Sequence, residues 1–331
     1  MAKRICSIVW AVAFLIVSNV GYGQGGAVYR NVGPDGTVTY TDIPSEGGAG
    51  GKSYKGGSKV ADPHDSAERA SSGNGAGTSQ MADDKSCGTG RTVMWADYFD
   101  QRLEGWGKLD YFWGRENVSF IVDPVVPGKV MKVFYPSGTF DPATMKRFGW
   151  RYGGAGLRSA LIPGQLDCVF FRYLVKFADN FQFVRGGKLP GLYGGKGIVS
   201  GVMPNGYDGF TSRYMWVERG GGSIYAYLPT SVTWGTYLGK GKFTFQPGVW
   251  HTLQQQVVLN APGRTNGVIR VWLDGKLVVN EQNLRFRDTS TLHLTGIYFD
   301  TFFGGNDRSW ATPVDTSIEF GAFVLSEQYV E

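Results

Sequence analysis

The chain of 331 residues is poor in the side chains that most often build metal and nucleophile sites, with three cysteines and three histidines. It contains no His-x-x-x-His or Cys-x-x-Cys pair, so we expect no catalytic zinc. The Gly-x-Ser-x-Gly elbow of serine hydrolases is also missing. A strand of the form Glu-x-Asp-x-x-Glu, which supplies the paired carboxylates of many retaining glycosidases, does not occur. These absences argue against metal-dependent, serine-dependent and retaining hydrolysis.

Long apolar runs are confined to the N-terminus. Lys3 and Arg4 precede an apolar run of about a dozen residues, and small residues follow at Gly21 and Gly23, which is the pattern of a signal peptide. We place cleavage near Gly23, so that the signal peptide is 1–23. No later stretch approaches the roughly 18 apolar residues of a membrane span. The sequence therefore predicts a secreted or periplasmic protein that does not span a membrane.

Cysteine usage and net charge set further limits. Without the signal peptide the formal charge falls from +5 to about +3, which is too small to indicate nucleic acid as a partner. Cys6 leaves with the signal peptide, and Cys87 and Cys168 remain. In an oxidising compartment these two could form one disulfide; the alternative is a buried, free Cys168 in a strand and an unpaired Cys87.

Two short segments precede the main body of the chain. Residues 24–46 contain the turn "GPDG" between two alternating apolar and polar runs, which predicts a hairpin too small to have its own core. Residues 47–90 are rich in Gly, Ser, Ala, Asp and Lys, and we expect them to form a flexible linker. The hairpin segment resembles a small domain of unknown function at the N-terminus of many exported proteobacterial proteins, through Tyr29, Asp35, Gly36, Tyr40, Thr41, Asp42 and Pro44.

The remainder, 91–331, is dense in short strand patterns broken by Gly, Asn, Asp and Pro. The segments 168–177, 250–260, 267–279 and 292–303 are each predicted to be strands, and "LDGK" within the third is a hairpin turn. No long helical period occurs. This pattern predicts an all-β domain, a single β-sandwich or β-jelly roll. The glycine-rich stretch "VRGGKLPGLYGG" (184–195) is predicted to be a hinge rather than a core strand.

Cations and phenols gather between 185 and 240. The basic residues there are Arg185, Lys188, Lys196, Arg213, Arg219 and Lys240, against only Asp208 and Glu218, and tyrosines occur at 193, 207, 214, 225, 227 and 237. Strand alternation places Thr211, Arg213 and Met215 on one face of "TSRYMW". It likewise places Tyr225 and Tyr227 on one face of "YAY". The turn between these segments makes them expected hairpin partners, so Arg213 and the tyrosine pair should lie close together.

This combination suits the eliminative cleavage of an acidic polysaccharide. The C5 proton of a uronate can be removed once its carboxylate is neutralised, which Arg213 or Lys188 could do. A tyrosine beside such cations would have its anionic form favoured and could move the proton. The plainer interpretation of the same residues is a packed Tyr-x-Tyr strand and a solvated arginine.

Several motifs in order, "GGKLPGLYGG", "TSRYMW", "YAY", "WHTLQQQVVLN", "GVIRVWLDGK" and "FDTFFGG", resemble polysaccharide lyase family 14, the alginate and glucuronate lyases with a β-jelly-roll fold. The resemblance implies that Lys188, Arg213, Tyr225 and Tyr227 are catalytic. We expect Thr211, Arg185, Tyr193 and Gln255 to contact substrate. Serine is usual in the family where this chain has Thr211, and a hydroxyl is kept. We expect no cofactor and no catalytic metal. A loop such as "GGND" could bind a structural calcium or could simply form a turn, and the sequence leaves both alternatives open.

The leading hypothesis is an exported lyase for a uronate polymer, with alginate ahead of glucuronan. Its main alternative is a jelly-roll module that binds acidic glycans without cleaving them, and a glycoside hydrolase ranks third. His251 could belong to the cleft or could be a structural residue at a strand end. The sequence does not choose between mannuronate, guluronate and glucuronate, because these differ by contacts within loops.

Overall fold

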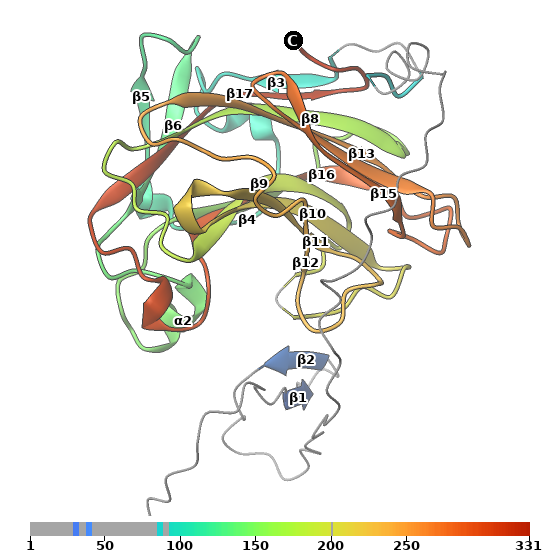
Figure 1. Cartoon of the computed structure of the whole chain (residues 1–331), viewed down its shortest axis with the longest axis horizontal. Helices are drawn as coiled ribbons and strands as arrows, with labels where there is room; N and C mark the ends of the chain where they lie inside the picture. Colours follow the sequence, from blue (N-terminus) through green and yellow to red (C-terminus); the bar gives the residue numbers. More distant parts are fainter. Residues whose placement is uncertain (1–28, 33–37, 42–84, 89–92, 200) are drawn as a thin grey trace, which may run out of the picture. The chain divides into compact units, whose positions relative to one another are not determined.

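The computed structural model describes residues 29–32, 38–41, 85–88, 93–199 and 201–331 (Figure 1). These fall into two compact units. The first contains β1 (Tyr29–Val32) and β2 (Val38–Thr41), which pair antiparallel. The predicted signal peptide and most of the predicted linker lie outside the described residues, and the family of the first unit remains a prediction.

The second unit is built of two antiparallel sheets that lie one above the other (Figure 1). In spatial order, the seven-stranded sheet contains β12 (Thr236–Leu238), β11 (Gly222–Tyr227), β10 (Gly209–Val217), β9 (Gly186–Gly195), β16 (Leu294–Phe303), β7 (Ala155–Ser159) and β4 (Leu109–Trp113). The eight-stranded sheet contains β15 (Lys276–Leu284), β14 (Gly267–Leu273), β13 (Trp250–Val258), β8 (Cys168–Phe177), β17 (Thr316–Ser326), β6 (Lys129–Tyr135) and β5 (Val118–Val122), with β3 (Trp95–Asp97) paired to β17. This architecture confirms the predicted all-β sandwich.

Helical structure in the described part of the chain is limited to short turns between strands. These are η1 (Glu104–Trp106), η2 (Arg115–Asn117), α2 (Pro142–Arg147), η3 (Glu218–Gly220) and η4 (Arg308–Trp310). Asp141 caps α2 by accepting a hydrogen bond from the Thr144 backbone N–H at 2.9 Å. None of the described helices is long and apolar enough to cross a membrane.

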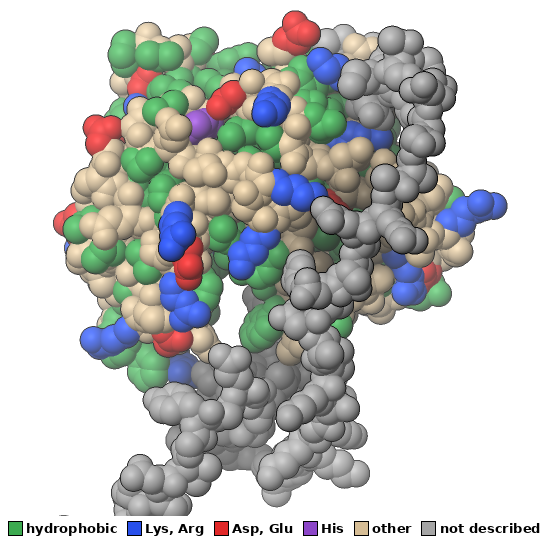
Figure 2. All heavy atoms as spheres, in the orientation of Figure 1, with side chains coloured by type: hydrophobic (Ala, Val, Ile, Leu, Met, Phe, Trp, Pro, Cys, Tyr) green, Lys and Arg blue, Asp and Glu red, His purple; other side chains and the backbone are tan. Residues whose placement is uncertain are grey.

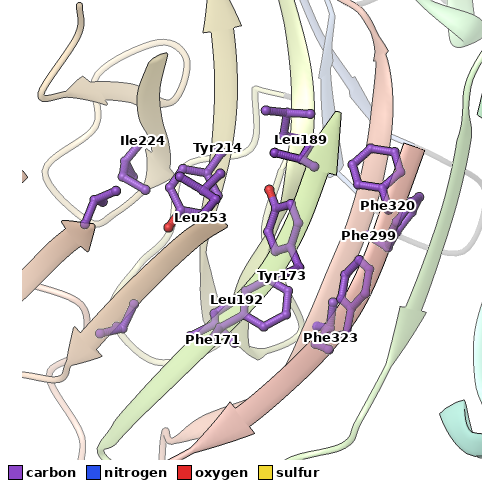
Figure 3. Close-up of a cluster of buried hydrophobic side chains, with 14 of the residues drawn as sticks. Phe171, Tyr173, Leu189, Leu192, Tyr214, Ile224, Leu253, Phe299, Phe320 and Phe323 are labelled. Carbon is purple, nitrogen blue, oxygen red and sulfur yellow. The ribbon is translucent and has the colours of Figure 1, made fainter. Parts of the chain in front are cut away.

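The core lies between the two sheets and is dominated by aromatic side chains (Figure 3). Tyr173 of β8 stacks on Phe323 of β17 with ring centres 5.1 Å apart, and Phe299 of β16 meets Phe320 at 5.0 Å. The second contact joins the two sheets directly. Each such pair contributes about 1 kcal/mol beyond its buried area.

The stretch predicted to be a hinge is instead β9, a strand inside the seven-stranded sheet, between β10 and β16. Its glycines permit close backbone packing: a Cβ on Gly191 would lie 2.1 Å from the carbonyl oxygen of Ser212 on β10. The register of β9 with β10 also shifts by one residue between the pairs Ser212–Leu192 and Tyr214–Leu189, which is a β-bulge. The prediction failed because Gly and Pro are common in flexible segments and also at bulges.

The bulge has a consequence for side-chain direction. Lys188 and Tyr193 are five residues apart and would lie on opposite faces of a regular strand. The extra residue restores their alignment, so that Leu189 and Leu192 both enter the core, where they are fully buried. Lys188 and Tyr193 are thereby left on the outer face of the sheet.

A disulfide joins Cys87 to Cys168 of β8, which decides between the two alternatives left open by the sequence. Around it, the Cys87 backbone N–H donates to the carbonyl of Glu327 at 2.8 Å, and Ser86 forms a β-bridge with Gln328. Residues 85–88 therefore belong to the sandwich. The folded domain begins earlier than the predicted boundary at residue 91.

Candidate active site

The outer face of the seven-stranded sheet, opposite the core, gathers five polar or polarisable side chains that we call the site cluster. They are Lys188 (β9), Arg213 and Met215 (β10), Tyr225 (β11) and Asp300 (β16). Arg213 is directly opposite Tyr225 in the antiparallel register of β10 and β11, as the hairpin prediction required. In the space-filling view the molecule is hollowed beneath this sheet, and Lys and Arg side chains lie along the edge of the hollow (Figure 2).

Lys188 is at the centre of the cluster. Its Nζ lies 3.5 Å from the centre of the Tyr225 ring and 2.8 Å from Sδ of Met215. Burial lowers the pKa of the Lys188 ammonium well below its usual value, and the positive charge of Arg213 lowers it further. The negative charges of Asp300 and Asp141 oppose this shift without cancelling it. Lys188 is therefore held in an environment that favours the neutral amine.

The tyrosine pair lies beside this lysine. The Tyr225 and Tyr227 rings meet edge to face at 5.6 Å, and Tyr237 of β12 extends the row at 4.9 Å from Tyr225. Burial raises the pKa of Tyr225 far above its usual value, and its hydrogen bond to Tyr227 adds to the effect, while Arg213 opposes it. Arg213 favours the tyrosinate, as predicted, but desolvation outweighs its attraction, so the surroundings of Tyr225 favour the neutral phenol.

Arg213 is committed to a carboxylate from another strand. Its Nη1 donates to Oδ2 of Asp300 at 2.6 Å, and the two residues are only 3% and 8% exposed. Burial raises the pKa of Asp300 to about 6, although Arg213 and Lys188 both act to lower it. The guanidinium also lies 5.0 Å from the centre of the Tyr298 ring. Arg213 Nε is buried without a hydrogen-bond partner.

The predicted substrate contacts are distributed over several places. Thr211 is on the same face as Arg213, but its hydroxyl donates to the Ile198 carbonyl at 2.9 Å beneath the loop that follows β9. Tyr193 packs against the guanidinium of Arg158 of β7 at 5.3 Å, and burial raises its pKa to about 12. Arg185 is exposed at the start of β9 and stacks on Trp310 at 4.7 Å.

Gln255 requires a correction. It is on β13 of the other sheet and is completely buried between the sheets. Its Oε1 accepts from the Ser212 hydroxyl at 2.8 Å, and its Nε2 donates to the Ser212 carbonyl at 3.2 Å. Both ends of the amide are therefore occupied inside the sandwich, and Gln255 cannot contact a polymer on the outer face.

His251 also has a structural environment. It accepts from the backbone N–H of Gln246 through Nε2 at 3.0 Å, and Nδ1 pairs with Asp274 of the β14–β15 turn at 2.8 Å. Of the two possibilities left open, the strand-end role is the one that these contacts support. In the "GGND" loop, the Asp307 carboxylate accepts from the Ser309 backbone N–H at 2.8 Å and caps η4. The described residues contain no cluster of three potential metal ligands.

Sequence reasoning missed Asp300 of the site cluster and the neighbouring Arg158, and it placed Met215 on the same face as Arg213 without giving it a role. Asp300 is a single carboxylate inside the otherwise apolar strand "GIYFDTFF", which is a signal that could have identified it. Arg158 lies within 6 Å of the ring centres of Tyr111, Tyr193 and Tyr298. No sequence signal connects it to β9, because that proximity depends on the pairing of β7 with β16.

A β-sandwich with Lys188, Arg213 and the tyrosine pair on one sheet face is the arrangement that the resemblance to polysaccharide lyase family 14 implies. The chain belongs to the polysaccharide lyase 14 family, whose model matches residues 125–323. It is thus a polysaccharide lyase, which favours the leading hypothesis over the binding module and the hydrolase.

Solved structures agree with this assignment. The chain is 30% identical to the marine PL-14 alginate lyase from Aplysia kurodai, with a TM-score of 0.63, over 71% of this chain and 98% of that one. The alginate lyase vAL-1 from Chlorella virus is 19% identical with a TM-score of 0.61, over 71% and 99% of the two chains. The alginate lyase Aly36B is 19% identical with a TM-score of 0.56, over 75% and 97%. No curated protein matches the chain.

Proposed function

We propose that this chain is an exported alginate lyase that cleaves its polymer by β-elimination, with Lys188 as the base that removes the C5 proton. The observation that carries the proposal is the position of the Lys188 amine, 3.5 Å above the Tyr225 ring in the middle of the sheet face. The 30% identity to an alginate lyase supports alginate as the substrate.

The proposed base differs from the one expected from sequence, for an electrostatic reason. A base must be unprotonated before it acts, and burial favours the neutral form of an amine and of a phenol alike. The neutral amine is a base, whereas the neutral phenol is an acid. The lowered pKa of Lys188 therefore suits proton removal, and the raised pKa of Tyr225 suits proton donation.

Tyr225 is accordingly proposed to protonate O4 of the departing sugar. Tyr227 has a supporting role in this scheme, because its hydroxyl accepts from the Gly201 backbone N–H at 3.2 Å and it hydrogen-bonds with Tyr225. The cation proposed to lie near the reacting carboxylate is Arg213. Its charge would stabilise the negative charge that develops on the uronate as C5 loses its proton.

Export is proposed from the N-terminal sequence pattern. The Cys87–Cys168 disulfide supports it, because structural disulfides persist mainly in oxidising compartments.

The roles of Lys188 can be separated by three substitutions. Lys188→Met keeps the length of the apolar stem and removes the amine, Lys188→Arg keeps a cation that cannot act as a base, and Lys188→Ala leaves space for an added amine. We expect each to reduce kcat by about 100-fold or more, the usual scale for a lost general base. Turnover is followed by the ultraviolet absorbance of the new C4–C5 double bond, with alginate, glucuronan and hyaluronan compared.

Two further measurements make the test specific. Added methylamine should restore part of the activity of Lys188→Ala and none of the activity of Lys188→Met, in which the site is filled. Because the folded protein disfavours the charged lysine, Lys188→Met should unfold at the same temperature as the parent or a higher one. If Lys188→Arg retained activity within about threefold of the parent, well short of that scale, Lys188 would be a carboxylate-neutralising cation and the proposed base would be wrong.

A further inference from the structure

The C-terminus of α2 carries an exposed pair of stacked aromatic rings. The helix ends in a Schellman motif, in which Gly149 has φ +68° and its N–H donates to the Lys146 carbonyl at 3.0 Å. The Trp150 N–H donates to the Met145 carbonyl at 2.9 Å. This motif reverses the chain between Phe148 and Trp150, and their rings stack 4.8 Å apart with planes 27° from parallel.

An arginine guanidinium packs against each of the two rings. The Arg147 guanidinium lies 4.7 Å from the centre of the Phe148 ring, and the Arg308 guanidinium of η4 lies 5.2 Å from the Trp150 ring. Phe148 and Trp150 are nevertheless 51% and 41% exposed. We call Arg147, Phe148, Trp150 and Arg308 the platform. Aromatic residues and arginines are the side chains enriched at the interaction surfaces of proteins, so the platform has the composition of such a surface.

Within the described residues, the platform arginines form no ion pairs, although Asp307 precedes Arg308 in the chain and Asp141 precedes α2. The segment 142–152 contains Lys146, Arg147 and Arg151 but no acidic residue. A guanidinium lying on an aromatic ring keeps its in-plane N–H groups free and loses little entropy when it binds a carboxylate. The platform is thus preorganised for a ligand with repeated carboxylates.

The platform is connected to the site cluster by two routes. Lys146 of α2 lies 5.6 Å from the ring of Trp113, which hydrogen-bonds Asp300. A six-residue helix such as α2 is only about 9 Å long, so its C-terminus is close to this contact. On the other side, Arg185 at the start of β9 donates to the Ser309 hydroxyl of η4 at 2.6 Å. Figure 1 shows α2 beneath the same sheet.

We propose that the platform is a second binding site for the polyuronate chain, outside the site cluster, which holds a long polymer while another part of it is cleaved. The inference rests on the proposed function for the identity of the ligand, and its occupant is the acidic polysaccharide itself. Charge complementarity selects this occupant, because two fixed guanidinium groups match carboxylates that recur along the polymer. A substrate too short to reach from the site cluster to the platform would gain nothing from it.

The test compares polymeric alginate with an alginate tetrasaccharide in Arg147→Ala/Arg308→Ala and Phe148→Ala/Trp150→Ala. We expect KM for the polymer to rise about tenfold, the scale of two exposed charge contacts, with kcat unchanged. The kcat/KM for the tetrasaccharide should stay within about twofold of the parent, and the difference between polymer and tetrasaccharide should shrink in high salt. Arg264→Ala, which removes an exposed arginine on a loop of the other sheet, is the matched control and should change neither substrate.

Binding is measured separately by migration through gels containing alginate, in a Lys188→Met background. Weaker retention of the platform variants supports the inference even if the parent cleaves no uronate polymer, in which case only the proposed function fails. Unchanged polymer KM and unchanged retention would overturn the platform while leaving the lyase activity intact. An equal loss on the tetrasaccharide would also overturn it, because the residues would then act on the site cluster. Melting temperatures identify variants that fail to fold, and Phe148→Leu/Trp150→Leu then replaces the alanine pair.

Discussion

The buried Asp300 carboxylate makes a quantitative prediction about stability and pH. Its pKa is raised from 3.8 to about 6, mainly by burial. Because the folded protein holds this proton more tightly than the unfolded chain, the stabilisation from Asp300 is fully present below pH 3.8 and is lost as pH rises through about 6. A shift of this size corresponds to about 3 kcal/mol. As pH rises through this range, the free energy of unfolding of Asp300→Asn should therefore increase by about 3 kcal/mol relative to that of the parent.

The assay is urea unfolding of the parent and of Asp300→Asn at several pH values, with the difference in the free energy of unfolding plotted against pH. The prediction concerns how this difference changes with pH. The cost of leaving Arg213 unpaired in Asp300→Asn does not depend on pH, so it cancels when values at two pH values are subtracted. Asp208→Asn is the control, because Asn205 and Lys196 lower the pKa of this exposed carboxylate. The difference in the free energy of unfolding between Asp208→Asn and the parent must therefore change with pH in the opposite direction. A difference for Asp300 that stays constant within about 0.5 kcal/mol would show that Arg213 fully offsets burial, and the reasoning would be refuted.

Three other predictions concern the framework of the site. In Gly191→Ala, the new Cβ would lie 2.1 Å from the Ser212 carbonyl oxygen, so we expect lower thermal stability and loss of activity; a fully active, equally stable variant would contradict the role of the bulge. Replacing Cys87 and Cys168 by serine opens a loop of sequence separation 81 and should lower the free energy of unfolding in urea by about 4 kcal/mol, whereas a change below about 1 kcal/mol would count against this account. Deleting residues 24–84 should leave lyase turnover unchanged, and its complete loss in a folded product would disprove that expectation.

Local patterns in the sequence were sufficient for the elements that depend on neighbouring residues. The alternation of "TSRYMW" and "YAY" placed Arg213 and Tyr225 on one face, and the short turn between the strands brought them opposite one another. The "LDGK" turn was equally local, since Asp274 and Gly275 both have positive φ and connect β14 to β15. The family motifs then predicted that Lys188 belongs to the site. The alternation of side chains along a strand and the backbone conformation of a turn each depend on a few consecutive residues, so the sequence is enough to predict them.

The tertiary structure decided what those residues can do. Asp300 reaches Arg213 across 87 positions of sequence, and that pairing depends on the order of β10, β9 and β16 in the sheet. Strand order also made Gln255 a core residue bonded to the other sheet. The sequence also could not predict which protonation state is favoured at Lys188 and Tyr225, because this too depends on how the strands pack. A pKa depends on desolvation and on charges in all directions around a group, and both exist only once distant strands have packed together.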